Sequence, residues 1–213
     1  MPRLGVVGTL VWDTIYDRPG NWDDPVEEWG GIAYSLAGFD AALPNNWSLL
    51  PIVKVGQDMR DSADRFLKGL VHLDSLDGIR TVAEPNNRVE LIYVDEARRH
   101  EKLSGGVPGW TLEELLPVVR ACDALYVNFI AGWELDLQTA SVLRNAIAGP
   151  TYMDLHSLML GLDADVVSRV AGFEVSHRFL GHLVTPPPVP KIGPGGILGS
   201  AGLFSVNGAS HLQ

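Results

Sequence analysis

Apolar and polar positions along this chain predict strands and helices in alternation. Short apolar runs closed by glycine or turn residues are typical of buried strands, and apolar residues three or four positions apart are typical of helices. From residue 48 onward the two kinds of segment alternate, apart from one hairpin. This order predicts an α/β fold, with a mainly parallel sheet sandwiched by helices. The predicted strands are 4–8, 11–16, 48–55, 124–129 and 151–155, the helices are 31–43, 58–71, 111–121 and 135–148, and the hairpin strands are 89–94 and 100–103.

Local signals define several of these boundaries. Thr111, with Glu114 three residues later, has the capping-box pattern that predicts the start of a helix. Pro44-Asn45-Asn46 has the turn chemistry that ends a helix. The segment Gly20–Gly31 is acidic, rich in Trp and contains a proline, so we predict a loop or an irregular lid there.

The end of the chain has a different composition. Lys191 is the only charged side chain in residues 181–213, where glycine and proline are frequent. The run Pro186–Pro190 excludes a helix or a central strand, because proline lacks the amide donor that both require. We therefore predict a folded part, residues 1–161, and an atypical Gly- and Pro-rich tail, residues 162–213, that does not pack as part of the same domain.

Composition and charge narrow the classes of function. Hydrophobic residues make up 46% of the 213 residues and charged residues 20%, which is a globular balance. The formal net charge of −10 argues against a nucleic-acid surface, which needs clustered Lys and Arg. Neither a signal-peptide pattern nor a run of about 18 apolar residues occurs, so we predict a cytoplasmic protein with no membrane partner.

The single cysteine also limits the chemistry. One cysteine excludes an intramolecular disulfide and a cysteine-based zinc site. Cys122 lies in the apolar stretch before Leu125-Tyr126-Val127, whereas a catalytic thiol would need a basic, accessible neighbourhood. The sequence therefore predicts that Cys122 is a small buried hydrophobic residue.

Three polar features lie at the ends of predicted strands or at the start of a helix, which is where open α/β sheets bind ligands. The carboxylate of Asp13 could accept hydrogen bonds from two neighbouring hydroxyl groups of a sugar, although the position alone is also typical of a surface strand. Gly30-Gly31 at a helix start would let an oxygen-rich ligand approach the backbone N–H groups. Lys54–Asp58 is a strand end, a tight turn and an acidic N-cap, a pattern that by itself is more often structural.

In this order and spacing, the three features resemble the N-terminal half of the ribokinase-like (PfkB) carbohydrate kinase family. The resemblance extends from about Leu4 to Gly161. It implies a ribokinase-like fold with a small β lid over the sugar, and an ATP-dependent kinase that acts on a sugar or nucleoside. The segments that carry it are 6–13, 30–43, 53–58, 88–103, 126–135 and 153–157.

The resemblance also implies substrate contacts for individual residues. Asp13 and the backbone of Gly30 and Gly31 match sugar-binding positions of the family. Ser35 stands where the family often has a substrate-binding Asn. Asn128 ends a predicted strand and could reach either substrate.

Asp154 and His156 follow the next predicted strand and are further candidates, although a hydrogen-bonded loop histidine is the simpler interpretation of His156. The family takes its catalytic Asp and its anion hole from a later Gly-Ala-Gly-Asp segment, and it has a metal-associated Asn-x-x-Glu motif. No Gly-Ala-Gly-Asp segment occurs here and no aspartate follows Asp165, and the segment Val206–Ser210 around Asn207 contains no glutamate. We therefore assign no catalytic residue and no metal ligand. ATP and Mg²⁺ are the cofactors that the resemblance implies, without an assigned site in this chain.

Two hypotheses account for a chain that resembles the sugar-binding part of the family but lacks the segment for phosphoryl transfer. The first is a kinase-derived chain, a truncation or frameshift product that ends before the catalytic Asp and is inactive alone. The second is a sugar-binding or regulatory module without turnover. A dinucleotide-dependent oxidoreductase is disfavoured, because Gly5-Val6-Val7-Gly8 lacks a third glycine and leads into a strand. The partner is a small-molecule sugar or nucleoside in both cases, and the edges of the hairpin would allow a homodimer through the lid.

Overall fold

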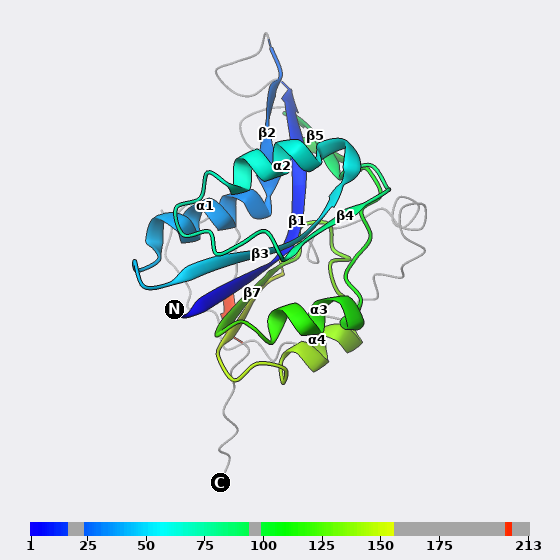
Figure 1. Ribbon diagram of the computed structural model, residues 1–213. Helices are drawn as coiled ribbons and strands as arrows, with labels where there is room; N and C mark the ends of the chain where they lie inside the picture. Colours follow the sequence, from blue (N-terminus) through cyan, green and yellow to red (C-terminus); the bar gives the residue numbers. More distant parts are fainter. Residues whose placement is uncertain (17–23, 94–98, 156–202, 206–213) are drawn as a thin grey trace, which may run out of the picture.

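The first strand belongs to two sheets. The computed structural model describes residues 1–16, 24–93, 99–155 and 203–205 (Figure 1). Strand β1 (Arg3–Tyr16) is one continuous element of 14 residues and takes in both strands that were predicted at 4–8 and 11–16. Residues 3–9 of β1 pair within a main sheet, and residues 10–16 pair within a smaller lid sheet.

The main sheet has the strand order β4–β3–β1–β7–β8–β9. Neighbouring strands are parallel, except that β9 runs antiparallel to β8. The mainly parallel sheet predicted from the sequence is therefore confirmed. Strands β3 and β7 are buried along their whole length, which explains why their sequences are continuous apolar runs. The strands besides β1 are β3 (Ser48–Gly56), β4 (Ile79–Val82), β7 (Ala124–Asn128), β8 (Thr151–Asp154) and β9 (Leu203–Ser205).

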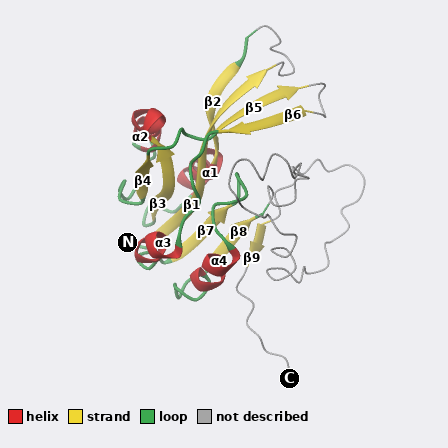
Figure 2. Ribbon diagram, turned by 90° about the vertical axis from the view of Figure 1, so that its right-hand side faces the viewer, coloured by secondary structure: helices red, strands yellow, loops and turns green. Residues whose placement is uncertain are grey.

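The lid sheet extends from one end of the main sheet (Figure 2). In it, β2 (Val26–Gly31) pairs antiparallel with β1, and β5 (Arg88–Tyr93) pairs parallel with β1 on the other side. Strand β6 (Arg99–Ser104) pairs antiparallel with β5, which confirms the predicted hairpin. The loop predicted for Gly20–Gly31 is wrong for Val26–Gly31, because pairing with β1 imposes an extended backbone on a segment that ends in two glycines.

In the described part of the chain, helices cover both faces of the main sheet (Figure 1). Helices α1 (Ile32–Ala42) and α2 (Arg60–Leu67) lie on one face, and α3 (Leu112–Val119) and α4 (Leu137–Leu143) lie on the other. Each face has its own core, because strand side chains alternate between the faces. Leu10, Ile32 and Leu36 are buried in the first core, and Leu115, Val127 and Leu143 are buried in the second.

Helix boundaries follow the local chemistry more closely than the apolar periodicity. The predicted capping box at the start of α3 is confirmed, with Thr111 as its N-cap. A short 3₁₀ turn, η1 (Gln57–Met59), precedes α2, so α2 is shorter than the helix predicted for 58–71. Helix α4 is likewise shorter than the predicted 135–148.

Besides β2, the sequence did not predict β4 and β9 among the described strands. Strand β4 has only four residues and buries only Ile79 fully, so it leaves no apolar pattern in the sequence. Strand β9 lies in the predicted tail, and the rest of residues 162–213 lies outside the described part of the chain.

Asn86 joins the lid sheet to the main sheet. Its side chain is fully buried, and its Oδ1 accepts a hydrogen bond from the N–H of Gly56 at 3.1 Å. Its Nδ2 donates to the carbonyl of Leu10 at 3.2 Å and to that of Asn87 at 3.0 Å. Gly56 ends β3, and Leu10 is where β1 enters the lid sheet. One amide therefore links both sheets at their junction.

Replacing Asn86 with Ala should lower the free energy of unfolding by about 2–4 kcal/mol, because the substitution removes three buried hydrogen bonds and leaves the Gly56 N–H without its acceptor. Urea denaturation measures this loss. Asn145→Ala is the matched control: Asn145 is exposed and donates one bond at 3.4 Å, so we expect a change below about 0.5 kcal/mol. Equal losses in the two variants would contradict this role for Asn86.

Candidate functional site

Strand β1 is the topological switch point of the main sheet. From β1 the chain passes through α1 to β3 on one side, whereas β7, which comes later, lies on the other side of β1. In open α/β sheets, ligands bind beyond the carboxyl ends of the strands at such a switch point. Elements that carry Asp13, Gly30-Gly31 and Asn128 meet at this position: the second half of β1, the start of α1 and the end of β7.

Asp13 and Gly30 lie in contact. Asp13 pairs with Glu28 of β2 and with Val89 of β5, and its side chain is almost fully buried. A Cβ atom built on Gly30 would overlap the Asp13 carboxylate. Glycine at position 30 is therefore what allows a buried carboxylate to lie against the backbone of β2.

Gly31 is the N-cap residue of α1. Its φ of 62° lies in the left-handed region, and a Cβ there would come 2.5 Å from the carbonyl oxygen of Thr9. Cγ2 of Ile130, just after β7, lies 3.2 Å from the same Cβ position. No side chain caps α1 and its first turn carries no acidic residue, so its first N–H groups are not satisfied by a capping side chain.

Ser35 of α1 and Asn128 of β7 also lie in contact. Asn128 Nδ2 donates to Ser35 Oγ at 3.1 Å and lies 3.4 Å from the hydroxyl of Tyr126. That hydroxyl lies 3.5 Å from Oδ2 of Asp154, and burial raises the pKa of Tyr126, so it stays a protonated donor. Asn128 is buried, and its Oδ1 has no hydrogen-bond partner among the described residues. His156 lies outside the described residues.

Glu134 is a buried carboxylate that the sequence did not single out. Its Oε1 accepts hydrogen bonds from Thr9 Oγ1 at 2.9 Å and from the N–H groups of Ile130 at 2.8 Å and Ala131 at 2.6 Å. Its Oε2 accepts from the N–H of Gly132 at 2.9 Å. Burial raises the pKa of Glu134, and these donors oppose that effect. The only signal in the sequence is an acid that follows a Gly-containing turn at the end of a buried strand.

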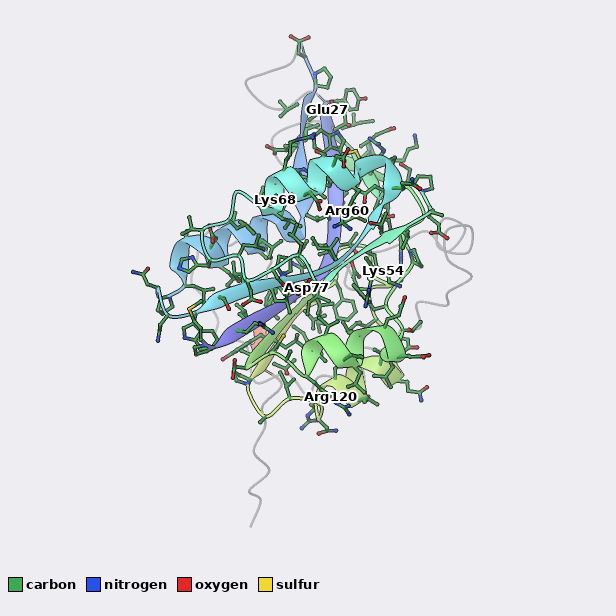
Figure 3. The ribbon with its side chains drawn as sticks, viewed as in Figure 1. Glu27, Lys54, Arg60, Lys68, Asp77 and Arg120 are labelled. Carbon is green, nitrogen blue, oxygen red and sulfur yellow. The ribbon has the colours of Figure 1, made fainter. Side chains whose placement is uncertain are left out.

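Lys54 is a buried cation near the carboxyl edge of the main sheet. Its ammonium donates to the carbonyl of Gly109 and to Glu114 Oε2, both at 2.8 Å, and lies 5.0 Å from the ring centre of Trp110. Figure 3 shows Lys54 between the main sheet and α3. Burial acts to raise the pKa of Glu114, but the bond to Lys54 and the backbone of Thr111 hold it below its usual value. The pair is thus an ion pair in which Lys54 is buried and Glu114 is partly exposed.

A cavity of about 510 Å³ opens between the loop that precedes α3 and the loop that precedes α4. A smaller hollow beside it is also lined by Val107, Trp110 and Trp133, and it extends to Gly8 and Thr9 of β1. The residues that line the larger cavity are Gly106, Val107, Pro108, Gly109, Trp110, Thr111, Leu112, Trp133, Asp136, Gln138 and Thr139.

Other candidate chemistry is limited in the described part of the chain. No group of three or more His, Cys, Asp or Glu side chains that could hold a metal ion occurs among these residues. Cys122 is buried as predicted, and burial raises the pKa of its thiol to about 11, so it is a poor nucleophile. Within the same residues, no helix is long and apolar enough to cross a membrane.

Comparison with known proteins identifies the class of fold. No family model and no curated protein matches the sequence. A ribokinase from Thermotoga maritima matches with a TM-score of 0.56 and 14% identity, over 80% of this chain and 58% of that one. An uncharacterized sugar kinase from Pyrococcus horikoshii matches with a TM-score of 0.55 and 16% identity, over 76% and 56%. Arabidopsis thaliana ribokinase, complexed with ribose and ATP, matches with a TM-score of 0.50 and 16% identity, over 70% and 52%.

The fold is therefore ribokinase-like, as the sequence predicted, and it is the fold of carbohydrate kinases. The matches span less than two thirds of the length of each of these solved chains.

Replacing Glu134 with Gln should lower the free energy of unfolding by about 2–3 kcal/mol, because an amide NH₂ would then face a backbone N–H that now donates to a carboxylate oxygen. Thermal unfolding at neutral pH provides the measurement. Glu113→Gln, at an exposed position of α3, should change stability by less than about 0.5 kcal/mol. An E134Q variant as stable as E113Q would show that the carboxylate does not hold the loop after β7.

Proposed function

We propose that this chain is the acceptor-binding portion of a ribokinase-like carbohydrate kinase, and that Asp13 binds hydroxyl groups of a sugar or nucleoside. The observation that carries the proposal is the position of Asp13, a buried carboxylate against the Gly30 backbone at the switch point of the sheet. The complex of Arabidopsis thaliana ribokinase with ribose and ATP supports a sugar as the ligand class.

The proposed contacts combine an acceptor and donors. The two oxygens of a carboxylate can accept hydrogen bonds from two neighbouring hydroxyl groups, which is the arrangement proposed for Asp13. The first N–H groups of α1, next to Gly30 and Gly31, suit an oxygen of the same ligand. We retain Asn128, whose Oδ1 lacks a described partner, and Ser35, to which Asn128 is bonded, as further substrate contacts.

Phosphoryl transfer is not assigned to these 213 residues. A base for the acceptor hydroxyl and donors for the transferred phosphate are the minimum requirements, and the sequence contains no Gly-Ala-Gly-Asp segment to supply them. ATP and Mg²⁺ are the cofactors implied by kinase likeness. The described residues offer neither a carboxylate cluster for a metal nor a cationic lining in the large cavity, so they do not fit a magnesium–phosphate group. We infer a kinase-derived chain that binds the acceptor and is inactive alone, because these 213 residues contain no Gly-Ala-Gly-Asp segment; the alternative is a sugar-binding or regulatory module.

Isothermal titration calorimetry of the chain with D-ribose, D-fructose and adenosine tests this function. We expect at least one of the three to bind, and Asp13→Asn to weaken that binding by about tenfold or more, because the amide removes a charged acceptor. Asp61→Asn, at an exposed position of α2, is the matched control and should bind like the unmodified chain.

The proposed site would be refuted if none of the three ligands bound, or if the D13N and D61N variants bound the ligand equally well. Transfer of phosphate from ATP to the bound ligand by the purified chain would refute the inferred lack of turnover. A cytoplasmic location and a homodimer through the lid stay predictions from the sequence.

A further inference from the structure

The cavity between the loops before α3 and α4 has the size of a small-molecule site. Its volume of about 510 Å³ lies within the range of about 300–1,000 Å³ that is typical of ligand pockets. Trp110, Trp133 and Pro108 are among the residues that line it, and of the two tryptophans Trp110 is buried whereas Trp133 is partly exposed. Flat apolar surfaces of this kind suit a ligand with a flat apolar face.

The walls of this cavity are held by hydrogen bonds that do not depend on a ligand. The indole N–H of Trp133 donates to the carbonyl of Val107 at 3.2 Å, and the N–H of Val107 donates to the buried Oδ1 of Asn87, also at 3.2 Å. The backbone N–H of Trp110 donates to the carbonyl of Glu134 at 2.8 Å. The two loops are thus fastened to each other and to the lid sheet, so the cavity is preformed.

The charges around the cavity disfavour an anion. Its lining, as far as the structure describes it, contains no Lys, Arg or His, and it includes the exposed carboxylate of Asp136. The nearby ammonium of Lys54 lines only the smaller hollow, where Glu114 neutralises it. A phosphate group in the cavity would face a negative charge without a compensating cation.

From this combination we propose that the cavity is a binding site for an uncharged ring, either the base of a nucleoside or the apolar face of a sugar ring, stacked on Trp133. The site is separate from the proposed Asp13 contact, because its lining includes none of Asp13, Gly30 and Gly31. It excludes the phosphorylated forms of the same ligands.

Calorimetry and quenching of tryptophan fluorescence test the proposal with two matched pairs of probes. Adenosine and AMP represent the nucleoside source, and methyl β-D-glucopyranoside and glucose 6-phosphate represent the sugar source. We expect one uncharged probe to bind at least about tenfold more tightly than its phosphorylated partner. Adenosine is also a candidate ligand of the Asp13 site, so each probe is titrated with the Asp13→Asn variant as well. Binding that Gln138→Trp weakens and Asp13→Asn leaves unchanged belongs to the cavity, and binding that only Asp13→Asn weakens belongs to the acceptor site, so a failure of the proposed acceptor site and a failure of the cavity give different results.

Two variants locate the binding. Trp133→Ala should weaken it by about tenfold or more. Gln138→Trp places a large ring at the exposed mouth of the cavity without removing a buried group, and it should weaken binding to a similar degree. Gln57→Trp, at an exposed position of η1, is its matched control and should have no effect.

Three results would overturn the proposal: no uncharged probe binds, a phosphorylated probe binds as tightly as its uncharged partner, or Gln138→Trp binds like Gln57→Trp. The Gln138 variant keeps the test valid if Trp133→Ala does not fold.

Discussion

Strand β1 is one continuous strand that pairs in both the main sheet and the lid sheet. Its residues 3–9 bond to β3 and β7 in the main sheet, and its residues 10–16 bond to β2 and β5 in the lid sheet. Because side chains alternate along a strand, Thr9 and Asp13 point to the same face. Thr9 is held there by its bond to Glu134, and Asp13 lies against Gly30. The position of the candidate sugar-binding carboxylate is thus set by a continuous strand rather than by a loop.

Buried polar side chains fix the segments around this strand. Asn86 links the end of β3 to the junction of the two sheets by hydrogen bonds. Glu134 accepts hydrogen bonds from the loop after β7 and from Thr9, so it joins that loop to β1. Burying such groups costs free energy unless they are bonded, and each here makes three or four hydrogen bonds. These hydrogen bonds offset the cost of burial. They also hold the switch point at β1, and the cavity between the loops before α3 and α4, in shape without a ligand.

Local patterns predicted the parts of the fold that depend on neighbours in sequence. The apolar runs of β3 and β7 and the Thr111 capping box were found because each signal lies within a few residues. Strand β2 was missed, because its extended backbone comes from pairing with β1. Glu134 was missed because its hydroxyl partner, Thr9, lies 125 residues away. Asp13 and Gly30 were linked through a family resemblance, and their contact comes from the pairing of β1 with β2.

The central claim is that the start of α1 and the Asp13 segment of β1 form one ligand site. Amide chemical-shift mapping by NMR of the ¹⁵N-labelled chain, titrated with D-ribose and D-fructose, tests it most directly. The account predicts that the largest shifts occur at the amides of Gly30, Gly31 and Asp13. Saturable shifts that leave these three amides unchanged, or no saturable shift with either sugar, would contradict it.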